Sequence, residues 1–157
     1  METTEHITLR NPTSFEELKS IEEWLLPDEE GQRWLASYLD VQALFRLLSD
    51  TRKILFLEYR DTNIGFVALE IAEGGKVVHF SLYLSPEWRG KGFGRLSLLS
   101  LQDYCQQLGA SQIKGGIEQD NQRSRACALS AGMSLVYPQS PDDDLIVASM
   151  VLKKAAT

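Results

Sequence analysis

Residues 86–96, with the sequence PEWRGKGFGRL, combine three glycines and three cationic side chains in a chain whose formal net charge is −6. These six residues are Arg89, Gly90, Lys91, Gly92, Gly94 and Arg95. Glycine loses more backbone entropy on ordering than any other residue, so three glycines in one loop need a structural reason. Successive backbone N–H groups in such a loop can form an anion-binding concavity. The alternative is a flexible surface turn.

The predicted elements on both sides of the loop favour anion binding over a flexible turn. The loop follows an apolar strand, 77–85, and leads into a helix, 95–109, with apolar residues at helical spacing. This arrangement directs the first N–H groups of the helix and the positive end of its dipole toward the loop. The predicted ligand is therefore a phosphate or pyrophosphate group. Neither the P-loop motif nor the dinucleotide-binding GxGxxG motif matches the glycine spacing.

One imidazole and two carboxylates near this loop could transfer protons. Alternation along the strand before the loop places His79 on the same face as Ser81 and Tyr83. This polar face either lines a cleft or is exposed to solvent. The carboxylates are Glu70, on the neighbouring strand across a hairpin, and Glu118, at the end of a later strand. All three remain candidates for a general base, together with proton removal through ordered water.

The elements that would position these groups are those of a mixed α/β domain. Strands are predicted at 6–11, 53–60, 64–72, 77–85, 111–118, 134–138 and 145–154, and helices at 14–26, 29–50, 95–109 and 121–132. Ser14 and Glu17 have the spacing of a capping box at the start of the first helix. We expect the last two strands to pair around the loop at 139–144. No repeat or linker interrupts the chain, which predicts one domain over residues 1–157.

Composition argues against several classes of protein. The net negative charge disfavours a nucleic-acid-binding surface, and no apolar run approaches the roughly 18 residues of a membrane span. The acidic N-terminal residues are not followed by an apolar signal segment, so the expected location is the cytoplasm. Cys105 and Cys127 would then remain free thiols. With only two histidines, the chain cannot form a multi-histidine metal site, and we expect no metal.

Three segments together resemble the GNAT superfamily of N-acyltransferases. Residues 82–101 (LYLSPEWRGKGFGRLSLLSL) are similar to its acetyl-CoA signature, Arg/Gln-x-x-Gly-x-Gly/Ala, on which Arg89, Gly92 and Gly94 fall. Residues 117–135 (IEQDNQRSRACALSAGMSL) and 63–71 (NIGFVALEI) resemble a strand–helix segment and the third strand of that family. The resemblance covers about residues 60–136, and the first 50 residues match only in having two helices.

The resemblance implies a mixed, mostly antiparallel sheet that is flanked by helices and splayed at the cofactor-binding strands. The pantetheine arm of acetyl-CoA would lie in the gap, and a backbone N–H near Leu82 or Tyr83 would polarise the thioester carbonyl. The pyrophosphate would lie on the N–H groups between Gly90 and Leu96. The implied cofactor-binding residues are Leu82, Leu84, Arg89, Gly90, Lys91, Gly92, Phe93, Gly94, Arg95, Asn121 and Ser124.

The resemblance also implies the reaction, which is transfer of an acetyl group from acetyl-CoA to a primary amine by direct attack in a ternary complex. Neither cysteine would then be a nucleophile. The acceptor is either a small cationic amine, which the acidic residues Asp28, Glu29 and Glu30 would favour, or a protein N-terminal amine. The alternative is a non-catalytic acyl-CoA sensor or a partner-binding module, and a homodimer is left open as its assembly.

One position departs from the pattern of the family. Many relatives carry a tyrosine seven residues after the asparagine that starts the later helix, and its hydroxyl protonates the departing thiolate of CoA. Counting from Asn121 leads to Ala128, which has no hydroxyl. Ser124 and Ser130 are the nearest hydroxyls in the sequence. Because the thiolate is a good leaving group near neutral pH, water could serve as the acid.

Overall fold

The computed structural model describes residues 5–140 and 145–153, and within them seven strands form one open sheet in the order β1-β2-β3-β4-β5-β7-β6. Neighbouring strands are antiparallel except for β4 and β5, which are parallel. The strands are β1 (Thr8–Arg10), β2 (Arg52–Tyr59), β3 (Thr62–Ala72), β4 (Val77–Leu84), β5 (Gln112–Glu118), β6 (Ser134–Val136) and β7 (Leu145–Val151). The predicted pairing of the last two strands is confirmed.

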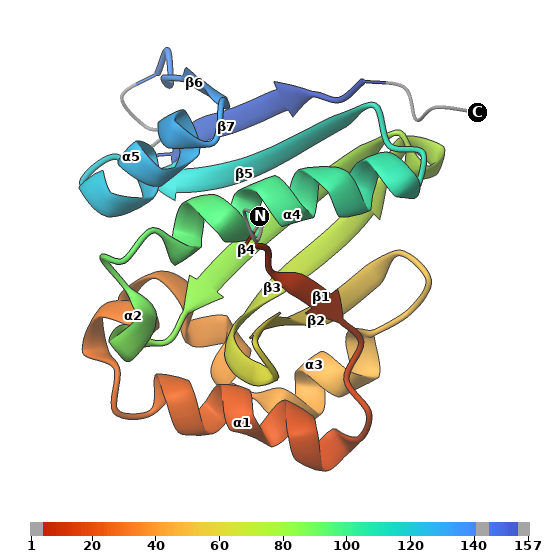
Figure 1. Ribbon diagram of the computed structural model, residues 1–157, viewed down its shortest axis with the longest axis vertical. Coiled ribbons are helices and arrows are strands. Elements are labelled where there is room, and N and C mark those ends of the chain that lie inside the picture. Colours follow the sequence, from red (N-terminus) through yellow and green to blue (C-terminus); the bar gives the residue numbers. More distant parts are fainter. Residues whose placement is uncertain (1–4, 141–144, 154–157) are drawn as a thin grey trace.

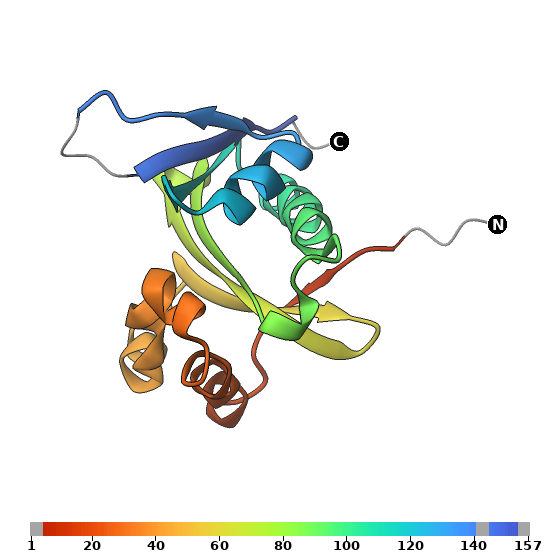
Figure 2. The ribbon, with the colours of Figure 1, turned by 90° about the vertical axis from the view of Figure 1, so that its left-hand side faces the viewer.

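Helices cover both faces of the sheet (Figures 1 and 2). The α-helices are α1 (Phe15–Leu25), α2 (Glu29–Leu35), α3 (Val41–Leu47), α4 (Phe93–Gln107) and α5 (Gln122–Ser130). Short 3₁₀ turns are η1 (Ala36–Leu39), η2 (Glu73–Gly75) and η3 (Pro86–Trp88). The helices α1 to α3 lie on one face, and α4 and α5 lie on the other (Figure 2). In the described part of the chain, no helix is long and apolar enough to cross a bilayer.

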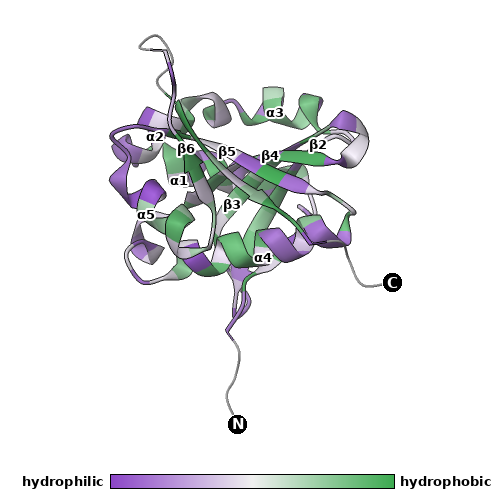
Figure 3. Ribbon diagram, turned by 90° about the horizontal axis from the view of Figure 1, so that it is seen from above, coloured by the Kyte–Doolittle hydropathy of each residue, from purple (hydrophilic) through white to green (hydrophobic). Residues whose placement is uncertain are grey.

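Two apolar clusters hold these layers together. On the α4 face, buried residues such as Leu55, Val67 and Leu101 form one cluster, and Phe56 and Phe66 belong to the other, under α1 and α3. Consecutive residues of a strand point to opposite faces, so β2 and β3 supply both clusters by alternation. In Figure 3 the strands between α3 and α4 are largely hydrophobic, whereas hydrophilic residues gather on helices and loops.

The sheet is splayed between β4 and β5. The two strands pair only from Val77 to Phe80 and from Gln112 to Gly115. Beyond these residues β4 continues along β3 and β5 continues along β7, so the two strands diverge (Figure 1). The predicted fold class, a mixed and mostly antiparallel sheet opened at this pair of strands, is confirmed.

Several predicted boundaries differ from the structure. The helix predicted at 29–50 is three shorter pieces, because helical geometry is lost at Leu35 and again at Asp40, which caps α3 by accepting a hydrogen bond from the Ala43 N–H. The helix after the glycine loop begins at Phe93, two residues earlier than predicted. Ser14 caps α1 as expected by accepting from the Glu17 N–H. Most of the loop predicted at 139–144 lies outside the described residues.

Candidate functional site

A cleft of about 1020 Å³ passes through the sheet where β4 and β5 diverge. Its walls come from the glycine loop, from α2, α4 and α5, and from the strands β4, β5 and β7. Its lining includes Trp34, His79, Ser81, Leu82, Gly90, Gly92, Gly94, Glu118, Asn121, Ser124 and Cys127. Residues that are far apart in the sequence therefore share one cavity.

The glycine loop has the backbone of an anion-binding site. Gly90 and Gly92 have φ angles of +73° and +89°, in the left-handed region that favours glycine. Gly92 is the N-cap residue of α4, and no side chain caps this helix start. The first N–H groups of a helix have no carbonyl partner within the helix, so those of α4 are available to an anion, and the helix dipole adds positive potential.

Gly94 is required for a different reason, which is close packing. A Cβ atom at this position would lie 2.6 Å from the Cys127 Sγ and 3.7 Å from a methyl carbon of Leu84. The first turn of α4 thus lies directly against α5 and the end of β4. The same position borders the cleft, so an added side chain would also reach the space of a bound anion.

We expect Gly94→Asp to weaken binding of CoA at least tenfold, equivalent to about 1.4 kcal/mol, because its carboxylate would repel a phosphate at the start of α4. Calorimetric titration with CoA measures the change. Gly94→Ala is the matched control, since it adds the same Cβ beside Cys127 without the charge, and we expect it to retain more affinity. Equal affinity in the parent and a folded Gly94→Asp protein would exclude a phosphate site at this position.

Arg89 lines the cleft, and its guanidinium is held in an ion pair. The resemblance implies a cofactor-binding role for this residue, and in the structure its guanidinium is largely buried and lies 2.6 Å from the Asp28 carboxylate. Its Nε donates a hydrogen bond of 3.0 Å to the carbonyl of Leu84. The physical reason is that a buried charge needs a partner of opposite charge. Arg89 therefore fastens the loop to α2 and β4.

The other flanking residues of the loop also differ in their roles. Lys91 is exposed and does not line the cleft. The ring of Phe93 packs on Tyr59 and Trp88, with centroids 4.7 Å and 5.1 Å away, so only its backbone is offered to a ligand. Arg95 lines the cleft, and its Nε donates to the Ser130 carbonyl at the end of α5. Arg95 is thus the exposed cation of the loop that borders the cleft.

Asp28 is the centre of a buried polar cluster that was not predicted. Its carboxylate accepts hydrogen bonds from the Tyr83 hydroxyl at 2.8 Å and from the Gly31 N–H at 3.1 Å, in addition to the contact with Arg89. Burial alone would raise the pKa of this carboxyl, but the bonds from Arg89, Gly31 and Tyr83 outweigh burial and lower it. Burial and the bond to Asp28 raise the pKa of the Tyr83 phenol.

The acidic segment before and within α2 is therefore not a free anionic patch. Asp28 is only 7% exposed and caps α2, so it is not available to a cationic acceptor. The Glu30 carboxylate lies 3.5 Å from Arg123 and 3.7 Å from Arg89. The capping role of Asp28 could have been predicted from its position directly before a helix, since aspartate is a preferred N-cap residue.

The candidate bases are distributed over two cavities. His79 and Ser81 line the cleft from β4, and Glu118 lines it from β5, on the opposite arm of the splay. Glu70 is the cross-strand partner of His79, as expected, but it lies 3.6 Å from Arg52 and lines a smaller neighbouring pocket. His79 and Glu118 therefore line the same cleft from different levels, since His79 is opposite Lys114 and Glu118 lies four residues further along β5, and Glu70 lines the neighbouring pocket.

The exposed backbone edge of β4 is shorter than predicted. Leu82 and Leu84 both border the cleft beyond the last pair with β5. The Leu84 carbonyl already accepts the bond from Arg89, so exchange of hydrogen bonds with an extended ligand depends mainly on Leu82. On the opposite arm, Asn121 caps α5 by accepting from the Ser124 N–H, which fixes the start of that helix at the edge of the cleft.

Sequence and structure comparisons agree on one family. Residues 18–133 match the acetyltransferase (GNAT) family. The chain belongs to this family. It is similar to the uncharacterized N-acetyltransferase YfmK of Bacillus subtilis (strain 168), with 27% identity over 129 residues, which cover 82% of this chain and 85% of that protein.

Solved GNAT structures have the same fold. AAC(6')-Ib in complex with parmomycin and acetyl-CoA superposes with a TM-score of 0.78 at 18% identity, covering 93% of each chain. RimL, an alpha-N-acetyltransferase of a ribosomal protein in complex with coenzyme A, superposes with a TM-score of 0.75 at 15% identity, covering 96% of this chain and 97% of that chain. At this level of identity the superposition shows the GNAT fold.

The missing GNAT tyrosine corresponds by counting to a core position. Ala128 is 2% exposed and belongs to the apolar cluster under α4 and α5, whereas the preceding residue, Cys127, lines the cleft. Ser124 and Ser130 also line the cleft, although the Ser130 hydroxyl donates to the Cys127 carbonyl. A hydroxyl at position 128 would therefore point into the core of this GNAT protein.

We expect Ala128→Tyr to lower stability by about 1–3 kcal/mol or more, because a large side chain would overpack the core, and to give no increase in kcat. Urea unfolding and initial rates measure the two effects. Cys127→Tyr is the matched comparison, since it places the same ring at the border of the cleft. A tenfold rise in kcat of Ala128→Tyr would show that position 128 reaches the reacting groups.

The two cysteines are free thiols, as predicted. Burial raises the pKa of Cys105 to about 12 and that of Cys127 to about 11, so both are protonated near neutral pH and are poor nucleophiles. Within residues 5–140 and 145–153, no group of three His, Cys, Asp or Glu side chains could hold a metal ion.

Proposed function

We propose that this GNAT protein transfers the acetyl group of acetyl-CoA to a primary amine by direct attack in a ternary complex. The observation that carries the proposal is the cleft through the splayed sheet, whose lining includes an anion-binding loop, His79 and Ser81 of β4, and Glu118 at the end of β5. Two substrates could enter from opposite faces and meet where β4 and β5 part.

The cleft fits CoA chemically. The N–H groups at the start of α4 would hold the pyrophosphate, with Arg95 as the nearby cation. The β4 edge at Leu82 would pair with the amides of the pantetheine arm as an added strand does. Gly94 has no side chain where it borders the cleft, so this stretch of the path stays open. Neighbours of the same fold were solved with acetyl-CoA or CoA, which supports this assignment.

Acetyl-CoA would supply an activated thioester. The amine nitrogen forms a bond to the acyl carbon while the carbon–sulfur bond breaks, and His79 takes the proton that the ammonium group must lose. A backbone N–H near Leu82 or Tyr83 polarises the carbonyl oxygen. The second proton leaves the nitrogen as the amide forms and passes through water to the departing thiolate, because Ala128 offers no hydroxyl and faces the core. Glu118, across the gap, is the alternative base.

Two kinds of acceptor fit the proposal, a small cationic amine and a protein N-terminal amine. The neighbours in the same fold include AAC(6')-Ib in complex with parmomycin and RimL, named for a ribosomal protein. The pairing of Glu30 with Arg123 and the burial of Asp28 remove much of the negative charge that a polycation would need. An amine with a single charge is therefore the better fit.

Release of free thiol from acetyl-CoA over a panel of amines, with the product confirmed by mass spectrometry, tests the proposal. Turnover with any amine is the expected result. Tight binding of CoA without turnover across a broad panel, including peptides, would instead support a non-catalytic acyl-CoA sensor.

A further inference from the structure

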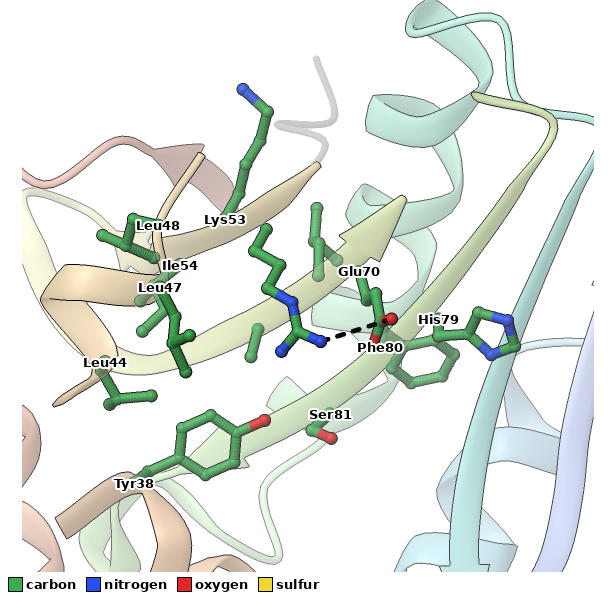
Figure 4. Close-up of a pocket in the computed structure, with 13 residues that line it drawn as sticks. Tyr38, Leu44, Leu47, Leu48, Lys53, Ile54, Glu70, His79, Phe80 and Ser81 are labelled. Atoms are coloured by element: carbon green, nitrogen blue, oxygen red, sulfur yellow. Dashed lines mark ion pairs between the residues drawn. The ribbon is translucent and has the colours of Figure 1, made fainter. Parts of the chain in front are cut away.

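A second, smaller pocket of about 140 Å³ lies beside the cleft, between α3 and the sheet (Figure 4). Five aliphatic side chains and one tyrosine form much of its surface: Leu44, Leu47, Leu48, Ile54, Ala68 and Tyr38. The Tyr38 ring rests on Phe66 with centroids 5.5 Å apart, and its hydroxyl points toward Ser81 (Figure 4). Neither the anion-binding loop nor CoA accounts for this pocket.

Two charged side chains of the lining pair with each other, and Lys53 and His79 also contribute to the lining. Arg52 and Glu70 are 3.6 Å apart, and both side chains are more than half exposed. Apart from these groups, Ser81 and the Tyr38 hydroxyl, the lining is aliphatic or aromatic. Dry apolar cavities of about 150 Å³ are large enough to bind benzene, so this pocket suits an aliphatic or aromatic group of that size.

The pocket opens where the two substrates would meet. His79, Phe80 and Ser81 line both the cleft and the pocket, and Phe80 is the last residue of β4 that pairs with β5. Ser81 is opposite Ala68, which is opposite Ile54, so the floor extends two strands away from the gap. Two inter-strand spacings are about 10 Å, which is the reach of a short side group.

We propose that this side pocket binds the apolar substituent of the acceptor, so that the preferred acceptor is a primary amine with a small aliphatic or aromatic group a few bonds from its nitrogen. The inference rests on the proposed acetyl transfer to an amine. A second ammonium group would lose its hydration against the leucines of the pocket, which disfavours polycations. The same chemistry occurs in a free alkylamine and in an N-terminal residue with an apolar side chain.

Rates with matched amines test the preference and separate these two sources. Ethylamine, propylamine and isopentylamine have similar basicity, and we expect kcat/KM to rise about tenfold or more from the first to the last. Glycinamide and leucinamide, and short peptides that begin with glycine or leucine, make the same comparison for an N-terminal residue. If the natural acceptor is a free amine, kcat/KM should rise more along the alkylamine series. If it is an N-terminal residue, kcat/KM should rise more from the glycine to the leucine compounds.

Filling the pocket identifies it as the origin of the preference. We expect Ala68→Leu to lower the ratio of kcat/KM for isopentylamine to that for ethylamine by about tenfold. Ala72→Leu makes the same change four residues later on β3, outside the pocket lining, and is expected to keep the ratio of the parent. An unchanged ratio in Ala68→Leu would overturn the proposal.

Methyl NMR gives a readout that does not depend on turnover. Isopentylamine added to the CoA-bound protein is expected to shift the methyl signals of Leu44, Leu48 and Ile54, and Ala68→Leu is expected to abolish these shifts. If the protein turns over amines with the same kcat/KM across the series and shows no methyl shifts, the proposed role of the side pocket is wrong and the proposed acetyl transfer still stands. Methyl shifts without turnover of any amine would support the pocket and overturn the proposed acetyl transfer.

Discussion

Asp28→Ala is expected to destabilise the protein by about 3–5 kcal/mol, the cost of breaking a buried ion pair by removing one partner. The substitution leaves the largely buried guanidinium of Arg89 without its carboxylate and removes the acceptor of the Tyr83 hydroxyl. It also removes the cap that accepts from the Gly31 N–H. Because Arg89 lies in the glycine loop, binding of CoA should weaken as well.

Urea unfolding of Asp28→Ala and of Glu29→Ala measures this effect. Glu29 is the adjacent acidic residue, exposed in the first turn of α2, and its loss should cost less than about 1 kcal/mol. If both proteins unfold within about 1 kcal/mol of the parent, the buried pair contributes little. The double variant Asp28→Ala/Arg89→Ala should recover part of the loss, because it removes the unpaired charge.

The contribution of Asp28 should also depend on pH. The pKa of its carboxyl is lower in the folded protein than the ordinary value of about 3.9 expected on unfolding. The stabilisation is therefore fully present above pH 4 to 5 and is lost as the pH falls through the folded value. The difference in stability between the parent and Asp28→Ala should shrink in the same acidic range.

His79→Ala is expected to lower kcat/KM by about 100-fold or more at neutral pH, the usual contribution of a positioned general base. His79 borders the cleft on β4, one residue before the end of its pairing with β5. Added imidazole should restore part of the rate, because it can enter the space left by the side chain. Initial rates at saturating acetyl-CoA, measured with and without imidazole, give the loss of kcat/KM and the part of it that imidazole restores.

Two glutamate variants distinguish the other candidates. Glu118→Gln removes the carboxylate that lines the cleft from β5, and Glu70→Gln removes the one paired with Arg52. A large loss in Glu118→Gln with a nearly unimpaired His79→Ala would transfer the role to Glu118. If none of the three substitutions costs more than about threefold, proton removal proceeds through water and no side chain is the base.

The sequence by itself determined the loop and its surroundings. Alternating glycines after an apolar strand and before an amphipathic helix predicted an anion site, and the structure places Gly90 and Gly92 in left-handed backbone at the start of α4. The splay of β4 from β5 followed from the resemblance to the GNAT superfamily. The loop is visible in the sequence because it depends on local backbone geometry, which a few adjacent residues specify.

Only the tertiary structure decided which groups these residues contact. Arg89 contacts Asp28, 61 positions earlier in the chain, and this contact links the glycine loop to α2. The side chain of Ala128 faces the core, and the side pocket beside His79 exists only because α3 lies against β2 and β3. Contacts of this kind depend on how distant elements pack, and sequence spacing carries no record of that packing. Burial then sets the chemistry, because a charge removed from water must find a partner wherever the fold supplies one.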